Sequence, residues 1–160
     1  MEVLVNMITI KEVTIIKTSQ ENIFNFLTSI DSLYKTWHPN DHVFCKSIYK
    51  DLNERGCLFH FLETIGGFPL YLILIVSKIK KNEYIEYRPI FPLSVFNLGK
   101  GSFAIERVSD ELSKLTAYVE YGNHFGLLDK ILQLFVKTEM LKKHIEEEGQ
   151  NIKNYLEQNT

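Results

Sequence analysis

The feature that most constrains this chain is a long central segment in which short strand-like runs follow one another without a helix between them. Runs of β-branched and aromatic residues recur from residue 43 to residue 121 and are separated by turn-forming residues. Gly66-Gly67 and Lys81-Asn82 lie between strong runs, and both predict tight turns. This pattern predicts an antiparallel meander. The expected strands cover residues 43–49, 57–65, 69–79, 83–89, 101–108 and 112–121.

A strand and two helical segments are expected before this meander. Residues 8–16 favour a strand, and Ser19 is placed to cap a helix. Apolar residues at spacings of three and four define one face of that helix. They are Ile23, Phe24, Phe26, Leu27 and Ile30. A second short helical turn is expected around residues 31–34, and Pro39 should keep residues 36–42 in a loop.

The last segment of the chain favours one long helix, expected from Leu127 to about Glu157. It contains no proline and, apart from Gly149, no glycine, and most of its residues are strong helix formers. The order of strand, helix pair, meander and long helix predicts an α+β fold. About seven antiparallel strands would form a curved sheet that buries one face against the last helix. A length of 160 residues with a 45% apolar fraction is consistent with one domain, covering residues 1–160.

Charge and hydropathy exclude several classes of partner. The chain has 18 Lys and Arg against 20 Asp and Glu, and no basic stripe, so nucleic acid is not an expected partner. The longest apolar run, residues 68–76, is half the length of a membrane span and contains Pro69. Glu2 stands where a signal peptide carries positive charge, so we expect a cytoplasmic protein. Cys45 and Cys57 are then expected to be reduced thiols.

His144 and Glu148 are the first candidate functional residues, because they fall on or beside the apolar stripe of the long helix. Leu134, Leu141, Ile145, Ile152 and Tyr155 form that stripe. A buried carboxylate needs a compensating partner. Side chains four residues apart on a helix have Cβ atoms about 5–6 Å apart, so both could reach one divalent ion. The alternative is a simple ion pair between His144 and Glu148 on the flank of the helix.

A loop and a strand offer further metal-ligating groups. Residues 37–42, with the sequence Trp-His-Pro-Asn-Asp-His, supply two histidines just before the sheet, although the same segment could be an aromatic turn with exposed histidines. Phe59, Phe61 and Glu63 share one face of a strand. If the two phenylalanines point into the core, the carboxylate of Glu63 points toward the long helix.

These residues resemble those of a known family. The layout of the whole chain resembles the START-like or SRPBCC superfamily, which has the helix-grip fold, includes polyketide cyclases, and surrounds an apolar cavity with a curved sheet and a long helix. Residues 37–42, 61–67 and 144–152 resemble the branch of that superfamily related to diacetylphloroglucinol hydrolase. Enzymes of that branch use zinc, held by two His and two Glu, to cleave a carbon–carbon bond between an acyl group and a phenolic ring.

The resemblance implies a set of metal ligands in this chain. They are His144 and Glu148 from the helix, Glu63 from the strand and His42 from the loop, with His38 as the reserve loop candidate. The implied cofactor is zinc or another divalent metal, which would polarise a carbonyl group. The implied activity is hydrolysis.

The expected partner is a small apolar or aromatic molecule. Tyr87, Phe103, Tyr121 and Asn123 are placed to line its pocket, although most aromatic residues on strands serve as core. Two functions remain open: a metal-dependent hydrolase acting on an aromatic or polyketide-like molecule, and a non-catalytic carrier of a lipid or other apolar ligand. A protein-interaction module has less support, and association into a homodimer is left open.

Overall fold

The computed structural model describes residues 8–90, 99–121 and 137–159. The elements are β1 (Ile8–Ile16), α1 (Gln20–Thr28), α2 (Ile30–Trp37), β2 (His42–Tyr49), β3 (Leu58–Ile65), β4 (Phe68–Lys80), β5 (Tyr84–Pro89), β6 (Lys100–Ser109), β7 (Leu112–Tyr121) and α4 (Thr138–Gln158). No helix among these described residues is long and apolar enough to cross a membrane.

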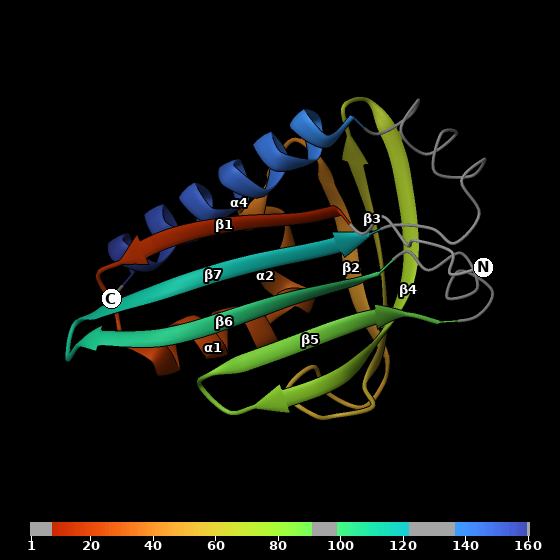
Figure 1. Cartoon of the computed structure of the whole chain (residues 1–160). Coiled ribbons are helices and arrows are strands. Elements are labelled where there is room, and N and C mark those ends of the chain that lie inside the picture. The colour runs from red at the N-terminus through yellow and green to blue at the C-terminus, as the bar shows by residue number, and fades with distance from the viewer. Residues whose placement is uncertain (1–7, 91–98, 122–136, 160) are drawn as a thin grey trace, which may run out of the picture.

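The strands form a single antiparallel sheet in the order β1-β7-β6-β5-β4-β3-β2. The sheet is strongly curved, α4 runs along β1, and α1 and α2 lie behind the sheet (Figure 1). Two of the predicted turns depend on left-handed backbone, since Gly66 and Gly67 have φ angles of 58° and 88°, and Asn82 has 62°. The predicted α+β architecture with a curved sheet and a long C-terminal helix is therefore confirmed.

The two short helices follow their sequence signals, with one correction. The side chain of Ser19 accepts a hydrogen bond from the backbone N–H of Asn22 and caps α1, as predicted. The second helix, expected as one turn, instead continues to Trp37, so part of the predicted loop is helical. The residue after this helix, His38, has extended backbone (φ −149°, ψ 85°), because the ring of Pro39 disfavours helical geometry in the residue before it.

The start of the C-terminal helix differs from the prediction. Lys137 has extended backbone (φ −67°, ψ 138°) and α4 begins at Thr138, so one continuous helix from Leu127 is wrong. Residues 127–136, including Leu134 of the predicted stripe, lie outside the described residues. Helix propensity is a sum over local preferences and does not by itself mark a first residue, especially without a capping side chain, and Lys137 makes no side-chain capping bond.

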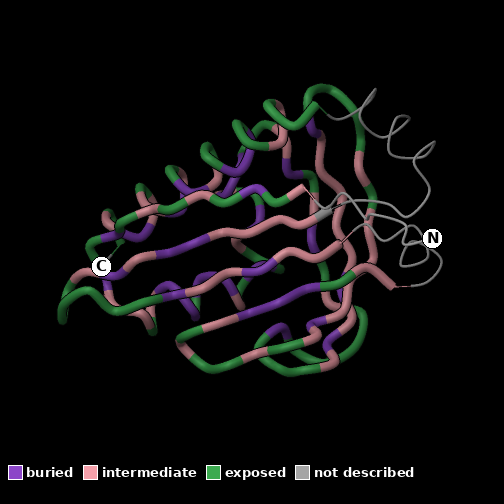
Figure 2. The backbone as a smooth tube through the Cα atoms, viewed as in Figure 1, coloured by how far each residue is buried: buried purple, intermediate pink, exposed green. Residues whose placement is uncertain are grey.

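The core lies between the inner face of the sheet and the helices. Ile145, Ile152 and Leu156 of α4 are buried, and buried residues recur along the strands and along α4 (Figure 2). Gly149 lets this helix pack closely on β1, because a Cβ atom there would lie 2.5 Å from the Thr14 hydroxyl oxygen. This close approach of α4 to β1 positions the helical residues on either side of Gly149. Cys45 and Cys57 are both free and buried, as expected.

Glu86 is a buried carboxylate on the face of the sheet opposite the one that carries Ile85 and Tyr87. It accepts hydrogen bonds from the Ser77 hydroxyl (2.8 Å), the Tyr84 hydroxyl (3.0 Å) and Arg88 Nε (3.0 Å). Lys78 Nζ and Lys100 Nζ lie 3.7 Å from it. Burial alone would raise the pKa of Glu86, but the hydrogen bonds from Ser77, Arg88 and Tyr84 outweigh it and lower the pKa to about 2. The ionised carboxylate therefore stabilises the fold.

We expect Glu86→Gln to destabilise the protein at pH 7 and to lose that effect in acid. A carboxyl whose pKa is lower in the folded state stabilises the fold above its unfolded pKa near 4.5, and the stabilisation is lost as pH falls toward 2. Because the partner cations are partly exposed, we discount the full shift and expect roughly 2 kcal/mol at pH 7. Urea unfolding at pH 7 and pH 2.5 measures the difference. Glu106→Gln, which removes an exposed partner of Lys114, is the control; a pH-independent loss at Glu86 would contradict the expectation.

Candidate metal centre

Three elements bring the predicted metal ligands into one place. His42 is the first residue of β2 and pairs directly with Glu63 on β3 in the antiparallel register. His144 and Glu148 lie one turn apart on α4, on the side that faces the sheet. The inward face of β3 is the one that carries Phe59 and Glu63, as the sequence alternation allowed. The group of four residues named by sequence therefore converges, and we call it the His2Glu2 cluster.

The distances within the His2Glu2 cluster are short. Nε2 of His42 lies 3.0 Å from Glu148 Oε1, 3.4 Å from Glu63 Oε2 and 3.3 Å from Nε2 of His144. Nε2 of His144 lies 3.8 Å from Glu148 Oε1 and 4.0 Å from Glu63 Oε2. The four side chains are between 0% and 16% exposed. The four polar side chains of the cluster are therefore largely buried.

The chemistry and spacing of these donors fit a zinc ion. Metal–ligand bonds of roughly 2.0–2.2 Å to imidazole nitrogen and carboxylate oxygen, arranged tetrahedrally, place neighbouring donor atoms roughly 3.3–3.6 Å apart. The separations of 3.0 to 4.0 Å in the cluster bracket that range. Two imidazoles and two carboxylates are ligands that zinc accepts. One potential ligand atom from each of the four residues lies within 4.8 Å of the other three.

The electrostatics of the cluster favour a bound cation. Burial, together with the nearby charge of Glu148, raises the pKa of Glu63 to about 7. Burial also lowers the pKa of His144. At His42 burial works in the same direction, but the hydrogen bond and charge of Glu148 and the charge of Glu63 outweigh it, and the pKa is raised. Two buried carboxylates that repel each other are the arrangement that a divalent ion would neutralise.

Tyr34 supports two of the four residues, and the sequence analysis missed it. Its hydroxyl donates a hydrogen bond to Glu63 Oε2 (2.6 Å), and its backbone carbonyl lies 2.9 Å from His42 Nδ1. The two rings stack with centroids 3.9 Å apart. A carbonyl can only accept, so Nδ1 of His42 carries a proton and Nε2 faces the cluster. The spacing of Ile30, Tyr34 and Trp37 along one helical face could have revealed it.

His38, the reserve candidate, lies outside the cluster. Its Nε2 atom is 2.8 Å from Glu147 Oε2, and its ring stacks on that of His144 with centroids 4.5 Å apart and planes at 14°. The end of α2 explains why His38 and His42 lie in different places. His38 leaves α2 toward α4, whereas His42 begins the strand that pairs with Glu63. The structure thus brings His42, and not His38, to Glu63, His144 and Glu148.

Two of the predicted ligand-lining residues, Tyr87 and Phe103, pack within the aromatic core. Tyr87 is buried and meets Phe59 and Phe103 edge to face, and Phe103 in turn contacts Trp37. The side chain of Tyr121 and the whole of Asn123 lie outside the described residues. Their role as ligand contacts therefore stays a prediction.

Glu12 is a further interior carboxylate that the sequence analysis missed. It shares the inward face of β1 with Ile10, Thr14 and Ile16, and an alternation of this kind could have identified it. With Glu148 and Phe103 it lines a crevice of about 10 Å³ between the sheet and α4. That volume has room for about one water molecule.

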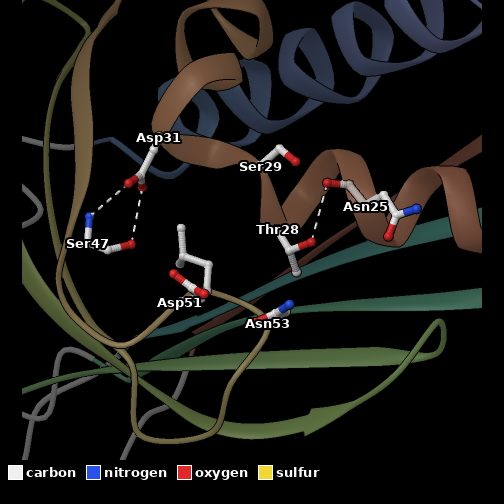
Figure 3. A pocket seen from close by; sticks show the side chains of 8 residues that line it. Asn25, Thr28, Ser29, Asp31, Ser47, Asp51 and Asn53 are labelled. Carbon is white, nitrogen blue, oxygen red and sulfur yellow. Dashed lines mark hydrogen bonds between the residues drawn. The ribbon is translucent and has the colours of Figure 1, made fainter.

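A separate surface hollow of about 360 Å³ lies beside the junction of α1 and α2. It is lined mainly by polar side chains (Figure 3). Asp31 accepts hydrogen bonds from the backbone and side chain of Ser47 (3.4 and 3.3 Å), and Thr28 donates to the carbonyl of Asn25 (3.3 Å). Several of these polar groups thus satisfy one another, and none of the His2Glu2 residues reaches this hollow.

Comparison with known proteins identifies the fold. No protein-family model and no curated protein sequence matches the chain. Among solved structures, the ginseng major latex-like protein 151 from Panax ginseng superposes with a TM-score of 0.72 at 12% identity, covering 93% of this chain and 97% of that one. A START superfamily protein from Mycobacterium smegmatis gives a TM-score of 0.70 at 17% identity, with coverages of 95% and 99%. The chain has the START-like, helix-grip fold.

A third solved structure with a similar fold is a synthase. Norcoclaurine synthase from Thalictrum flavum, in complex with dopamine and hydroxybenzaldehyde, gives a TM-score of 0.70 at 12% identity, covering 98% of this chain and 90% of that one. Identities this low establish shared architecture, and a START-like fold hosts many chemistries, so function has to be argued from the cluster itself.

Proposed function

We propose that this START-like protein binds one zinc ion, or a similar divalent metal, in the His2Glu2 cluster and hydrolyses a small aromatic or polyketide-like molecule. The observation that supports this most strongly is the meeting of four zinc-type donors, from β2, β3 and α4, in a buried site. Two carboxylates and two imidazoles buried together are costly unless an ion or a complete hydrogen-bond network compensates them. The aromatic ligands of a fold neighbour are consistent with the class of substrate.

The residues of this chain would have distinct roles in such a reaction. A zinc ion bound there supplies Lewis-acid polarisation of a substrate carbonyl. Tyr34 holds the carboxylate of Glu63 through its hydroxyl and orients His42 through its carbonyl. Because burial and the neighbouring Glu63 raise the pKa of Tyr34, its hydroxyl stays protonated and can donate a hydrogen bond. Phe59, Phe103 and Tyr87 form an apolar part of the core, in which the ring of Tyr87 meets the other two edge to face.

Metal analysis tests the proposal. We expect protein purified without chelator or affinity tag to contain about one zinc ion per chain by mass spectrometry, and His144→Ala to contain almost none. His60→Ala is the matched control, because His60 lies on the opposite face of β3 and bonds to the Tyr71 hydroxyl. A metal-free wild-type protein that co-purifies with an apolar molecule would contradict the metal proposal and support a non-catalytic carrier.

A further inference from the structure

A carboxylate outside the His2Glu2 cluster lies behind His144. Asp41 Oδ2 is 3.5 Å from Nδ1 of His144 and 3.4 Å from Nδ1 of His38. His144 thus has Nε2 toward the cluster and Nδ1 toward Asp41. His38, Asp41 and His144 also form a second group of potential ligand atoms within 4.8 Å of one another. The three residues could hold a second ion, or Asp41 could orient His144.

Ring geometry disfavours a second ion. The imidazoles of His38 and His144 are nearly parallel, with planes at 14° and centroids 4.5 Å apart. The lone pair of an imidazole nitrogen lies in the ring plane, so the lone pairs of stacked rings run side by side and do not converge on one point. An ion between them would require both rings to turn.

The hydrogen bonds of His38 leave the carboxylate of Asp41 available to His144. Nε2 of His38 lies 2.8 Å from Glu147 Oε2, and an ionised carboxylate only accepts, so that nitrogen carries the proton. Nδ1 of His38 lies 3.4 Å from Asp41 Oδ2 but is buried without a hydrogen-bond partner, so His38 does not use the carboxylate of Asp41 as an acceptor.

Two hydrogen bonds hold the backbone of Asp41 between the loop and β3. Its carbonyl accepts a hydrogen bond from the N–H of Thr64 (2.9 Å), beside Glu63, and its N–H donates to the carbonyl of His38 (3.1 Å). Asp41 therefore connects the loop to β3, and its carboxylate reaches α4. The backbone carbonyl of Tyr34 stands in the corresponding position behind His42.

We propose that Asp41 is a positioning residue that accepts the Nδ1–H of His144 and so keeps its Nε2 lone pair directed into the His2Glu2 cluster. The effect of Asp41 on metal affinity rests on the proposed function. Partners that orient a metal-ligating histidine in this way change metal affinity about 10- to 100-fold. The Nδ1–H tautomer of His144 is expected in the metal-free protein as well. His38, stacked on His144 and bonded to Glu147, keeps the ring from turning away.

The tautomer of His144 tests the proposal directly. We expect ¹⁵N NMR of the metal-free protein to show a protonated Nδ1 in the wild type. In Asp41→Asn the side-chain amide can donate to Nδ1, so the proton should move to Nε2 while the fold is kept. Zinc affinity should fall about 10- to 100-fold in that variant. Asp31→Asn, on the outer side of α2 where it bonds to Ser47, should change neither quantity.

The outcomes separate this inference from the proposed function. A wild-type protein with the proton on Nε2 overturns the role of Asp41 whether or not any variant folds. A second equivalent of zinc that binds the wild type and is lost in His38→Ala would also overturn the role of Asp41. The expected tautomers in a protein that binds no zinc would support the role of Asp41 and refute the metal proposal.

Discussion

Replacing His42 by alanine is expected to abolish tight zinc binding. Its Nε2 atom lies within 3.4 Å of a donor atom on each of the other three residues of the cluster, so it adjoins all of the other donors. Structural zinc sites bind with roughly 10–16 kcal/mol in total, or roughly 2.5–4 kcal/mol for each of four ligands. The loss should therefore be about 100- to 1000-fold in Kd.

A competition titration with a coloured zinc chelator measures this effect. His38→Ala is the informative comparison, because His38 lies beside the cluster but donates no atom to it. It should weaken binding far less than His42→Ala does. Equal losses in the two variants would mean that the loop as a whole, and not His42 as a ligand, determines affinity.

Zinc is expected to raise the thermal stability of the wild-type protein substantially. A ligand present at 100 times its Kd stabilises the folded state by about 2.7 kcal/mol, which corresponds to roughly 5–10 °C in Tm for a chain of this size. The Glu63→Gln variant should lose this shift. Differential scanning calorimetry with added zinc and with a chelator measures both states.

The metal-free form of Glu63→Gln gives a second expected result. Burial and Glu148 disfavour the charge on Glu63, whose pKa is raised to about 7. An amide removes that charge and still offers an oxygen to the Tyr34 hydroxyl. The metal-free variant should therefore unfold at a temperature no lower than the wild type does. A large drop in its Tm with chelator present would show that the carboxylate serves the fold rather than metal binding.

Local patterns were sufficient for most of the fold. The alternation of apolar and polar residues predicted the strands, and turn residues such as Gly66 and Asn82 marked their ends, because strand faces and left-handed turns are properties of short segments. Boundaries were less secure. The extension of α2 to Trp37 and the start of α4 at Thr138 depend on packing against other elements, which local propensity does not include.

The candidate site divides in the same way. Sequence by itself determined that His144 and Glu148 share a helical face and that Glu63 shares a strand face with Phe59, since both follow from the periods of helix and strand. Only the tertiary structure decided that His42 and not His38 joins them, and that Tyr34 and Asp41 lie behind the two histidines. These relations join residues up to about a hundred positions apart, and strand register and the docking of α4 on β1 set them.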